Sequence, residues 1–193
     1  VTADHGELAG VHGGMLGKGP DIYKETVRVP LLVRHPDARS GSTDALVGSI
    51  DLVPTLLAFA GLSDAERQQR YPDLHGVNVS SVIADAKART ARDERGILFN
   101  YGTPSGPLTG TGPGSNLRSL IRGVFDGRFK FGRYFKLHEH HEPRDWDTLV
   151  AHNDLELYDT QADPDEIVNL AFKPDEQKTR ILELNTKVNA LID

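Results

Sequence analysis

Two adjacent residues near the start of the chain have side chains that can bind a metal ion. Asp4 and His5 directly follow Val1-Thr2-Ala3, which reads as the end of a strand. Inside a strand their side chains would point to opposite faces, but a turn started by Gly6 would let both reach one ion. A carboxylate with an imidazole suits a hard or borderline divalent cation. The residues alone leave a plain alternative open, in which Asp4 makes a turn and His5 lies on the surface.

The elements that must position this pair have the pattern of an α/β sheet. A glycine-rich stretch, residues 6–20, follows the pair and permits tight turns and close backbone approach to a ligand. Residues 21–27 favour a short helix, and the apolar run 29–33 favours a strand buried on both faces. Residues 49–59 then favour a helix. In open α/β sheets, ligands bind beyond the carboxyl ends of strands, which is where the pair would lie.

The next part of the chain is read as a connection and a further short helix. Residues 63–75 are polar and connective, and residues 77–86 favour the helix. The pattern changes near residue 90. We therefore predict that residues 1–90 form the C-terminal part of a larger α/β sheet.

The remaining residues, 91–193, are predicted to form a small antiparallel sheet with a terminal helix. Four runs favour strands, at residues 97–101, 117–125, 128–135 and 156–159. Asp126-Gly127 separates the middle two, and Asp-Gly between apolar runs is a strong hairpin signal. Residues 175–192 have the apolar spacing of an amphipathic helix.

The composition limits the possible functions. The chain has 193 residues, of which 38% are hydrophobic and 26% charged, which suits a soluble globular protein with a sizeable core. It contains no cysteine, so disulfides, thiolate metal sites and a cysteine nucleophile are excluded from this sequence. The net charge is -6 with both signs mixed and no basic stripe, so we expect no nucleic-acid partner. No apolar run approaches the roughly 20 residues that span a bilayer, so we expect no membrane span.

Several motifs, in order along nearly the whole chain, together resemble one enzyme family, although none is specific alone. They are Thr2-Ala3-Asp4-His5-Gly6-Glu7, Gly10-Val11-His12-Gly13, Gly17-Lys18-Gly19-Pro20, Tyr23-Lys24-Glu25, Arg28-Val29-Pro30-Leu31, Ile50-Asp51-Leu52-Val53-Pro54-Thr55-Leu56-Leu57, Glu156-Leu157-Tyr158-Asp159, Asp163-Pro164-Asp165-Glu166 and Asn169-Leu170-Ala171. The chain resembles the C-terminal portion of an arylsulfatase-like protein of the sulfatase family, in the alkaline-phosphatase superfamily.

The resemblance implies a fold and a set of site residues. The fold would be the C-terminal part of an alkaline-phosphatase-like α/β sheet plus the small antiparallel sheet. Asp4 and His5 would be two ligands of the active-site divalent metal, with calcium expected and manganese or magnesium as alternatives. Lys18 would be a catalytic and substrate-binding residue, whose ammonium holds a sulfate oxygen where negative charge gathers in the transition state. His12 would either touch the substrate or brace the loop.

The resemblance also implies parts that this sequence lacks. Sulfatases use a cysteine or serine in a Cys/Ser-x-Pro-x-Arg motif, converted to formylglycine, and this sequence has no such motif. We therefore expect the formylglycine and the other metal ligands to lie upstream of Val1, and this chain alone to be inactive.

Three functions remain possible. The first is hydrolysis of a sulfuric ester, with a small-molecule sulfate ester as substrate. The second is hydrolysis of a phosphonate monoester or phosphodiester, by a relative in the same superfamily. The third is a non-catalytic metal-binding or interaction module. Because the run 29–33 would lack sheet neighbours, we also expect either self-association into a homo-oligomer or a fold in which the small C-terminal sheet is the better ordered part. The compartment stays open between bacterial cytoplasm and periplasm.

A histidine-rich segment, residues 138–154, has no single interpretation. It contains His138, His140 and His141. The segment reads as a solvated loop, as a cover over the active site or as a metal site, although its spacing fits no closed zinc site.

Overall fold

The computed structural model describes residues 1–102, 118, 120–136, 139 and 142–192. The chain forms two compact units, each built from two segments. Unit 1 contains Val1–Asp4 and Pro30–Ile97, and unit 2 contains His5–Val29 and Leu98–Asp193. The glycine-rich segment thus belongs to the same compact unit as the C-terminal residues, whereas the sequence pattern suggested one boundary near residue 90.

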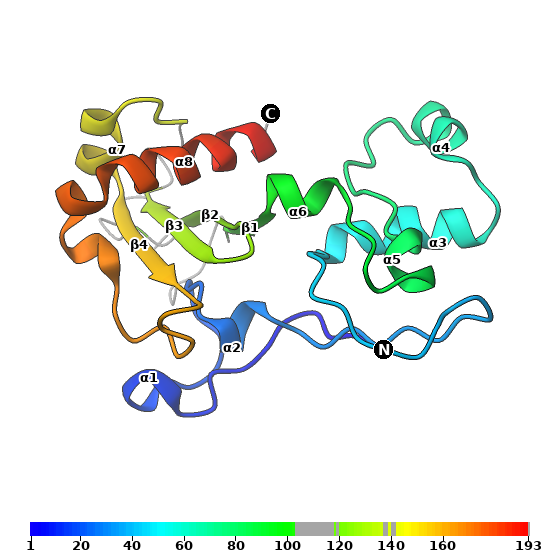
Figure 1. The fold of residues 1–193 in the computed structure, drawn as a ribbon. Helices are drawn as coiled ribbons and strands as arrows, with labels where there is room; N and C mark the ends of the chain where they lie inside the picture. The colour runs from blue at the N-terminus through cyan, green and yellow to red at the C-terminus, as the bar shows by residue number, and fades with distance from the viewer. Residues whose placement is uncertain (103–117, 119, 137–138, 140–141, 193) are drawn as a thin grey trace. The chain divides into compact units, whose positions relative to one another are not determined.

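Unit 1 consists of short helices joined by extended connections (Figure 1). Its elements are the 3-10 helix η1 (Ser49–Asp51), α3 (Leu52–Phe59), α4 (Asp64–Arg70), α5 (Ser80–Ala84) and α6 (Ala91–Arg95). The predicted helix over residues 49–59 is confirmed, as η1 followed by α3. The predicted helix over residues 77–86 is confirmed in its middle, as α5.

A buried ion pair links these helices. Asp51 is fully buried; its Oδ2 accepts a hydrogen bond from the backbone N–H of Gly48 (2.9 Å), and its Oδ1 accepts one from the N–H of Val77 (2.8 Å). Arg92 on α6 donates from Nε and Nη2 to the same carboxylate, at distances of 2.8 to 3.1 Å. Asp51 therefore ties η1, α6 and the segment before α5 together.

The segment read as a polar connection contains a helix instead. Ser63 caps α4: its hydroxyl accepts from the N–H of Glu66 (3.2 Å), and the Glu66 carboxylate accepts from the N–H of Ser63 (2.9 Å). This is a capping box, which satisfies two N–H groups at a helix start. The prediction that residues 63–75 form only a polar connection was therefore wrong. The Ser-x-x-Glu spacing of a capping box is present in the sequence and could have indicated the helix.

The apolar run 29–33 does not form the predicted buried strand. Only Leu31 forms a β-bridge, to Thr2, and Leu31 and Leu32 are 41% and 63% exposed. An apolar run predicts burial only where neighbouring strands cover it, and the described residues offer this run a single bridge. The predicted self-association stays a prediction, now with exposed apolar side chains as its basis.

Unit 2 is built around a four-stranded sheet in the order β1-β2-β3-β4. The strands are β1 (Ile97–Tyr101), β2 (Leu120–Phe125), β3 (Phe129–Phe135) and β4 (Asp154–Asp159). The β2–β3 hairpin is confirmed: Asp126 Oδ1 accepts from the N–H groups of Arg128 (3.0 Å) and Phe129 (2.8 Å), and Gly127 has φ of 100°. β3 and β4 pair antiparallel, with Lys130 opposite Tyr158.

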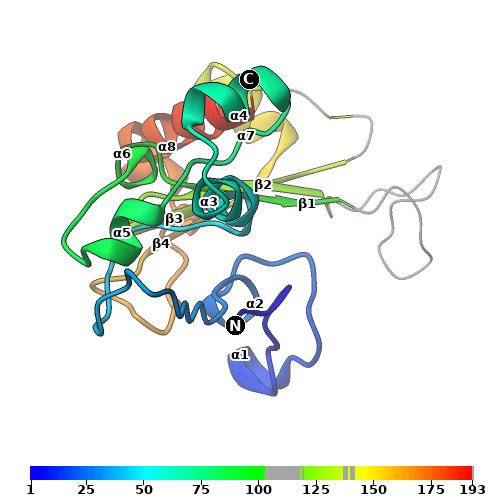
Figure 2. The same ribbon diagram turned by 90° about the vertical axis from the view of Figure 1, so that its right-hand side faces the viewer.

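Two layers cover the sheet of unit 2 (Figures 1 and 2). On one face lies α8 (Lys178–Ile192), the predicted terminal helix, which follows the 3-10 helices η3 (Leu170–Phe172) and η4 (Pro174–Gln177). α8 and α7 (Trp146–His152) enclose the main core: Val124, Phe131, Leu149, Leu157, Ala171, Ile181, Leu184 and Val188. Across the sheet, Ile22 packs with Ile121 and Tyr158, which anchors the segment that carries α1 (Val11–Gly14) and α2 (Lys24–Val27).

A fully buried arginine fixes α8 to the sheet. Arg133 on β3 donates from Nη1 to the side-chain oxygens of Asn185 and Asn189 (2.7 Å for Asn189). Both asparagines in turn donate to the carbonyl oxygen of Pro143. Burial, with the like charge of Arg122, lowers the pKa of Arg133 to about 10.

Part of the histidine-rich segment is helical rather than a loop. α7 begins after Asp145, whose Oδ1 accepts from the N–H of Thr148 (2.9 Å). His138, His140 and His141, and with them the metal-site interpretation, lie outside the described residues.

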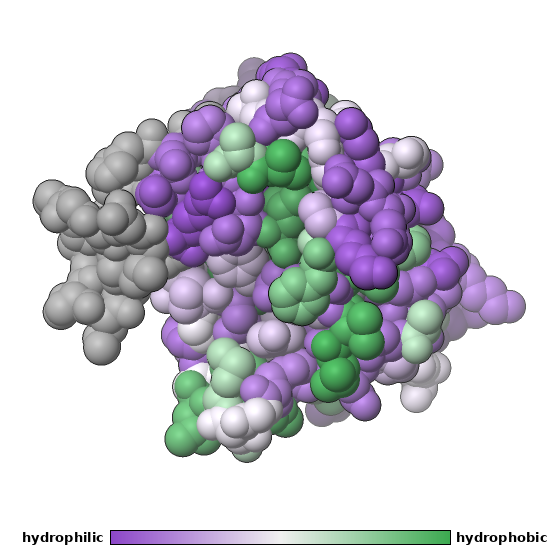
Figure 3. All heavy atoms as spheres, turned by 90° about the vertical axis from the view of Figure 1, so that its left-hand side faces the viewer, coloured by the Kyte–Doolittle hydropathy of each residue, from purple (hydrophilic) through white to green (hydrophobic). Residues whose placement is uncertain are grey.

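The surface carries both polar and apolar side chains. On the face in Figure 3, hydrophobic areas are small and lie between hydrophilic ones. In the described part of the chain, no helix has the length and apolar character needed to cross a bilayer.

Candidate functional site

The segment after Asp4-His5 is held by a close backbone contact that requires glycine. The N–H groups of Gly6 and Glu7 donate to the carbonyl oxygens of Thr26 and Glu25, each at 2.9 Å. A Cβ atom on Gly6 would lie 1.8 Å from the carbonyl oxygen of Glu25. Since no side chain fits in that space, Gly6 lets the start of the glycine-rich loop lie directly against α2.

Asp4 and His5 carry groups whose chemistry suits a divalent cation. His5 is half-buried, and its Nδ1 lies 2.8 Å from the carbonyl oxygen of Gly6. A carbonyl can only accept, so Nδ1 is the donor in this contact, and Nε2 is the ring nitrogen that would bind a metal. Asp4 is exposed and ends the first segment of unit 1, whereas His5 begins unit 2. These two residues fit part of a ligand set.

The described residues do not complete that ligand set. None of them form a group of three or more His, Asp or Glu side chains that could hold a metal ion. Two ligands bind a metal weakly, and divalent cations such as Ca²⁺ take six or more ligands. The metal role of Asp4 and His5 therefore stays a prediction that needs ligands from other residues.

Lys18 is exposed on a loop whose backbone is fixed on both sides. The N–H of Gly17 donates to Glu7 Oε1 (2.6 Å), and the N–H of Gly19 donates to Asp21 Oδ2 (3.1 Å). Asp21 is itself buried, and its Oδ1 accepts from the N–H of Tyr23 (3.1 Å). The two carboxylates thus position the backbone around Lys18 while its ammonium stays accessible to an anion.

His12 braces the loop. Its side chain is only 8% exposed, its Nε2 lies 3.1 Å from Glu25 Oε2, and its ring stacks on Tyr23 with 3.7 Å between ring centroids. Partial burial raises the pKa of Glu25, but hydrogen bonds from its own backbone and from His12 outweigh this, and the pKa is lowered overall. These contacts favour the bracing role among the two expected for His12, and the substrate contact stays a prediction.

The sequence reading missed the carboxylates that build this loop. These carboxylates are Glu7, which accepts from the N–H of Gly17, Asp21, which accepts from the N–H of Gly19, and Glu25, which contacts the ring of His12. For Asp21 a signal existed, because Gly-Pro-Asp marks a turn in which the Asp side chain bonds the backbone two residues on. For Glu7 and Glu25 the partners lie 10 and 13 residues away, which no local pattern reveals.

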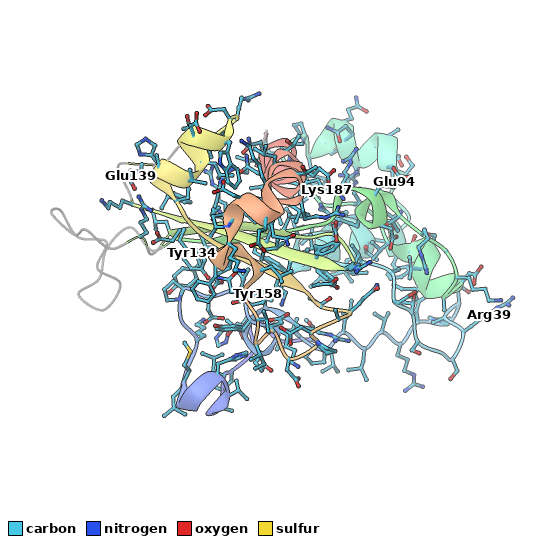
Figure 4. The ribbon with its side chains drawn as sticks, turned by 60° about the vertical axis from the view of Figure 1, so that its left-hand side comes forward. Arg39, Glu94, Tyr134, Glu139, Tyr158 and Lys187 are labelled. Carbon is cyan, nitrogen blue, oxygen red and sulfur yellow. The ribbon has the colours of Figure 1, made fainter. Side chains whose placement is uncertain are left out.

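A partly buried polar cluster lies next to Ile22, on the face of the sheet opposite α8 (Figure 4). Tyr134 donates its hydroxyl to Glu156 Oε2 (2.6 Å), and Tyr158 packs beside them. Burial raises the pKa of Glu156 more than the two tyrosine hydroxyls lower it, and the charge of Asp21 adds to the rise. Burial and the neighbouring Glu156 also raise the pKa values of both tyrosines.

Replacing Glu156 by glutamine is expected to stabilise the protein at neutral and alkaline pH. Folding raises the pKa of Glu156 above 4.5, the ordinary value of a glutamate. The folded state therefore binds more protons above pH 4.5, and stability falls as the pH rises through the folded pKa. Glutamine still accepts from Tyr134 but does not ionise. Thermal unfolding at about pH 5 and about pH 8 should show a gain in Tm that is larger at the higher pH. Glu183→Gln, an exposed change on α8, is the control, and an equal gain at both pH values would contradict the prediction.

Comparison with known proteins places the chain in one enzyme group. A family model described as N-sulphoglucosamine sulphohydrolase, C-terminal, matches residues 18–193, so that Lys18 is the first matched residue. The uncharacterized sulfatase YidJ of Escherichia coli K12 is 32% identical over 100 residues, covering 52% of this chain and 17% of that protein. An arylsulfatase of Volvox carteri is 26% identical over 210 residues, covering 99% of this chain and 28% of that protein.

A solved structure shows the same fold. The phosphonate monoester hydrolase of Agrobacterium radiobacter superposes with a TM-score of 0.69 and 25% identity, over 98% of this chain and 34% of that one. This chain therefore spans less than a third of the two curated relatives and about a third of that structure.

Proposed function

We propose a function on the basis that the chain belongs to the N-sulphoglucosamine sulphohydrolase C-terminal family, and thus to the sulfatases. The sequence resemblance to a sulfatase C-terminal portion is confirmed by this match. The protein that contains this chain hydrolyses a sulfuric ester of a small molecule. The observation that carries the proposal is Lys18, an accessible ammonium on a loop fixed from both sides, 13 residues after a carboxylate–imidazole pair.

Lys18 binds the anionic end of the substrate in this proposal. An ammonium is a compact charge with three donors, which suits the oxygens of a sulfate group. Its effect is largest as negative charge builds up in the transition state, because the loop holds the backbone at Lys18 in place before the substrate arrives. Glu7 and Asp21 contribute to this role by holding the backbone of the loop.

Asp4 and His5 would hold a divalent metal ion, for which we propose Ca²⁺. When bound, the ion would supply positive charge that polarises a sulfate oxygen and an attacking oxygen. The Nδ1–H of His5 donates to the carbonyl oxygen of Gly6, a contact that would orient the ring for such a role. We propose that formylglycine and the remaining ligands come from residues outside this sequence, which has no cysteine and no Ser-x-Pro-x-Arg motif.

A second candidate is hydrolysis of a phosphonate monoester. It is favoured by the likeness to the phosphonate monoester hydrolase, which covers nearly the whole chain. Sulfate and phosphonate esters both present anionic oxygens to a lysine, so Lys18 fits either substrate.

A substrate comparison on the intact protein tests the two candidates. The values of kcat/KM are measured for 4-nitrophenyl sulfate and for 4-nitrophenyl phenylphosphonate, with Ca²⁺ or Mn²⁺ added. A higher value for the sulfate supports the proposal, and a higher value for the phosphonate overturns it in favour of the second candidate. Hydrolysis of neither ester, by folded protein, would support a non-catalytic module.

A further inference from the structure

The segment that carries Lys18 is attached to the sheet through its C-terminal end, at Ile22. Ile22 is buried against Ile121 and Tyr158, so the segment passes through the core directly after Asp21. Tyr23 follows and supports the ring of His12. The position of the loop therefore depends on where the first residues of α2 are held.

The first residues of α2 are held by residues 164–166, which lie 140 to 142 positions away in the sequence. The N–H of Lys24 donates to Glu166 Oε2 (2.8 Å), and the ammonium of Lys24 donates to the carbonyl oxygen of Pro164 and to Asp165 Oδ1, each at 2.6 Å. The other oxygen of Glu166 accepts from the ammonium of Lys130 on β3. Glu166 thus joins α2 to β3, an inner strand of the sheet.

Glu166 is in an unusual position for a residue that only closes a turn. It is 2% exposed, and its φ of 55° lies in the left-handed region that a non-glycine residue rarely adopts. Its partner Lys130 is also buried, and burial lowers the pKa of Lys130 although Glu166 opposes that effect. Backbone strain and two desolvated charges persist only where the surrounding structure requires them. Here the strained, buried Glu166 accepts the hydrogen bond from the N–H of Lys24.

We propose that Glu166 is a positioning residue for the substrate-binding loop: through the N–H of Lys24 it sets the place of residues 6–24 and thereby of Lys18. The C-terminal motif Asp163-Pro164-Asp165-Glu166 then acts in substrate binding without touching substrate. The effect of Glu166 on substrate binding by Lys18 rests on the proposed function. The effect of Glu166 on the position of residues 6–24 does not.

Hydrogen–deuterium exchange on the intact protein tests the link to the loop. Lys24 and Lys130 donate to different oxygens of Glu166, and in Glu166→Gln one of these oxygens becomes an NH2 group, which cannot accept. Amides of residues 6–27 should therefore exchange about tenfold faster or more. Amides of β2–β4 and α8 should keep their rates. Unchanged loop rates, or an equal increase throughout the unit, would overturn the proposal.

A second variant and a matched control keep this test decisive. In Glu166→Gln/Lys130→Met the amide oxygen is released from Lys130 and becomes available to Lys24, so loop protection should return. Loop rates equal to those of the single variant would count against the proposal. Asn189→Ala removes a buried bond under α8 and should raise exchange there, leaving the loop unchanged.

Kinetics on the intact protein test the link to Lys18. Glu166→Gln should lower kcat/KM for 4-nitrophenyl sulfate about 10- to 100-fold at equal folded fraction, since small misplacements of a binding group have effects of that size. In a Lys18→Ala background the same substitution should cost less than about threefold, because the two residues act as one unit. Fully additive losses would overturn the proposal. A protein that hydrolyses no sulfate ester removes the proposed function but leaves the exchange result valid.

Discussion

Lys18→Ala is expected to lower kcat/KM of the intact protein for an aryl sulfate about 100- to 1,000-fold, the usual effect of removing one charge-stabilising donor. Lys18 is exposed, and the bonds around it run through the backbone of Gly17 and Gly19, so Tm should stay unchanged. Lys18→Arg keeps the charge but replaces a compact ammonium by a planar guanidinium, and should recover only part of the lost kcat/KM.

The control for this experiment is a lysine of the same unit outside the loop. Lys173 is 74% exposed and lies 3.1 Å from Glu176, so Lys173→Ala should leave kcat/KM within about twofold. Wild-type kcat/KM in Lys18→Ala, measured with saturating metal, would remove Lys18 from the site.

Asp51→Ala is expected to lower the free energy of unfolding by about 3–5 kcal/mol, the effect of leaving one partner of a buried ion pair alone. The change leaves the guanidinium of Arg92 buried without its carboxylate, and the N–H groups of Gly48 and Val77 lose their acceptor. Urea unfolding followed by circular dichroism measures the loss.

Two further variants isolate the cause of that loss. Asp64→Ala, at a side chain that is 64% exposed, should change stability by less than about 1 kcal/mol. Asp51→Ala/Arg92→Met removes the orphaned charge and should recover part of the stability. Equal losses in the single and double variants would show that the ion pair is not the cause.

Local signals in the sequence predicted the local parts of the fold. The Asp126-Gly127 hairpin formed because glycine adopts the positive φ and the Asp126 carboxylate binds two following N–H groups. Residues 178–192 formed the terminal helix because Ile181, Leu184 and Val188 share one face against the sheet. In both features the pattern that predicts the element lies within a short stretch of the sequence, although the helix also packs against the sheet.

Features that depend on distant residues were not predictable. The run 29–33 has the composition of a buried strand, yet burial depends on neighbours that the run itself does not specify. Glu166 and Lys24 are 142 residues apart, and nothing near either residue indicates their hydrogen bond. In the candidate site the sequence identified residue types able to bind metal and sulfate, while the carboxylates that fix the loop emerged only from the structure.

The most direct test of the central claim is a crystal structure of the intact protein grown with Mn²⁺ and a sulfate ester, with anomalous scattering used to locate the metal. We expect an anomalous peak coordinated by an oxygen of Asp4 and by Nε2 of His5, with the ammonium of Lys18 on the sulfate beside it. A metal bound elsewhere, or a Lys18 side chain far from both the metal and the ester, would contradict it.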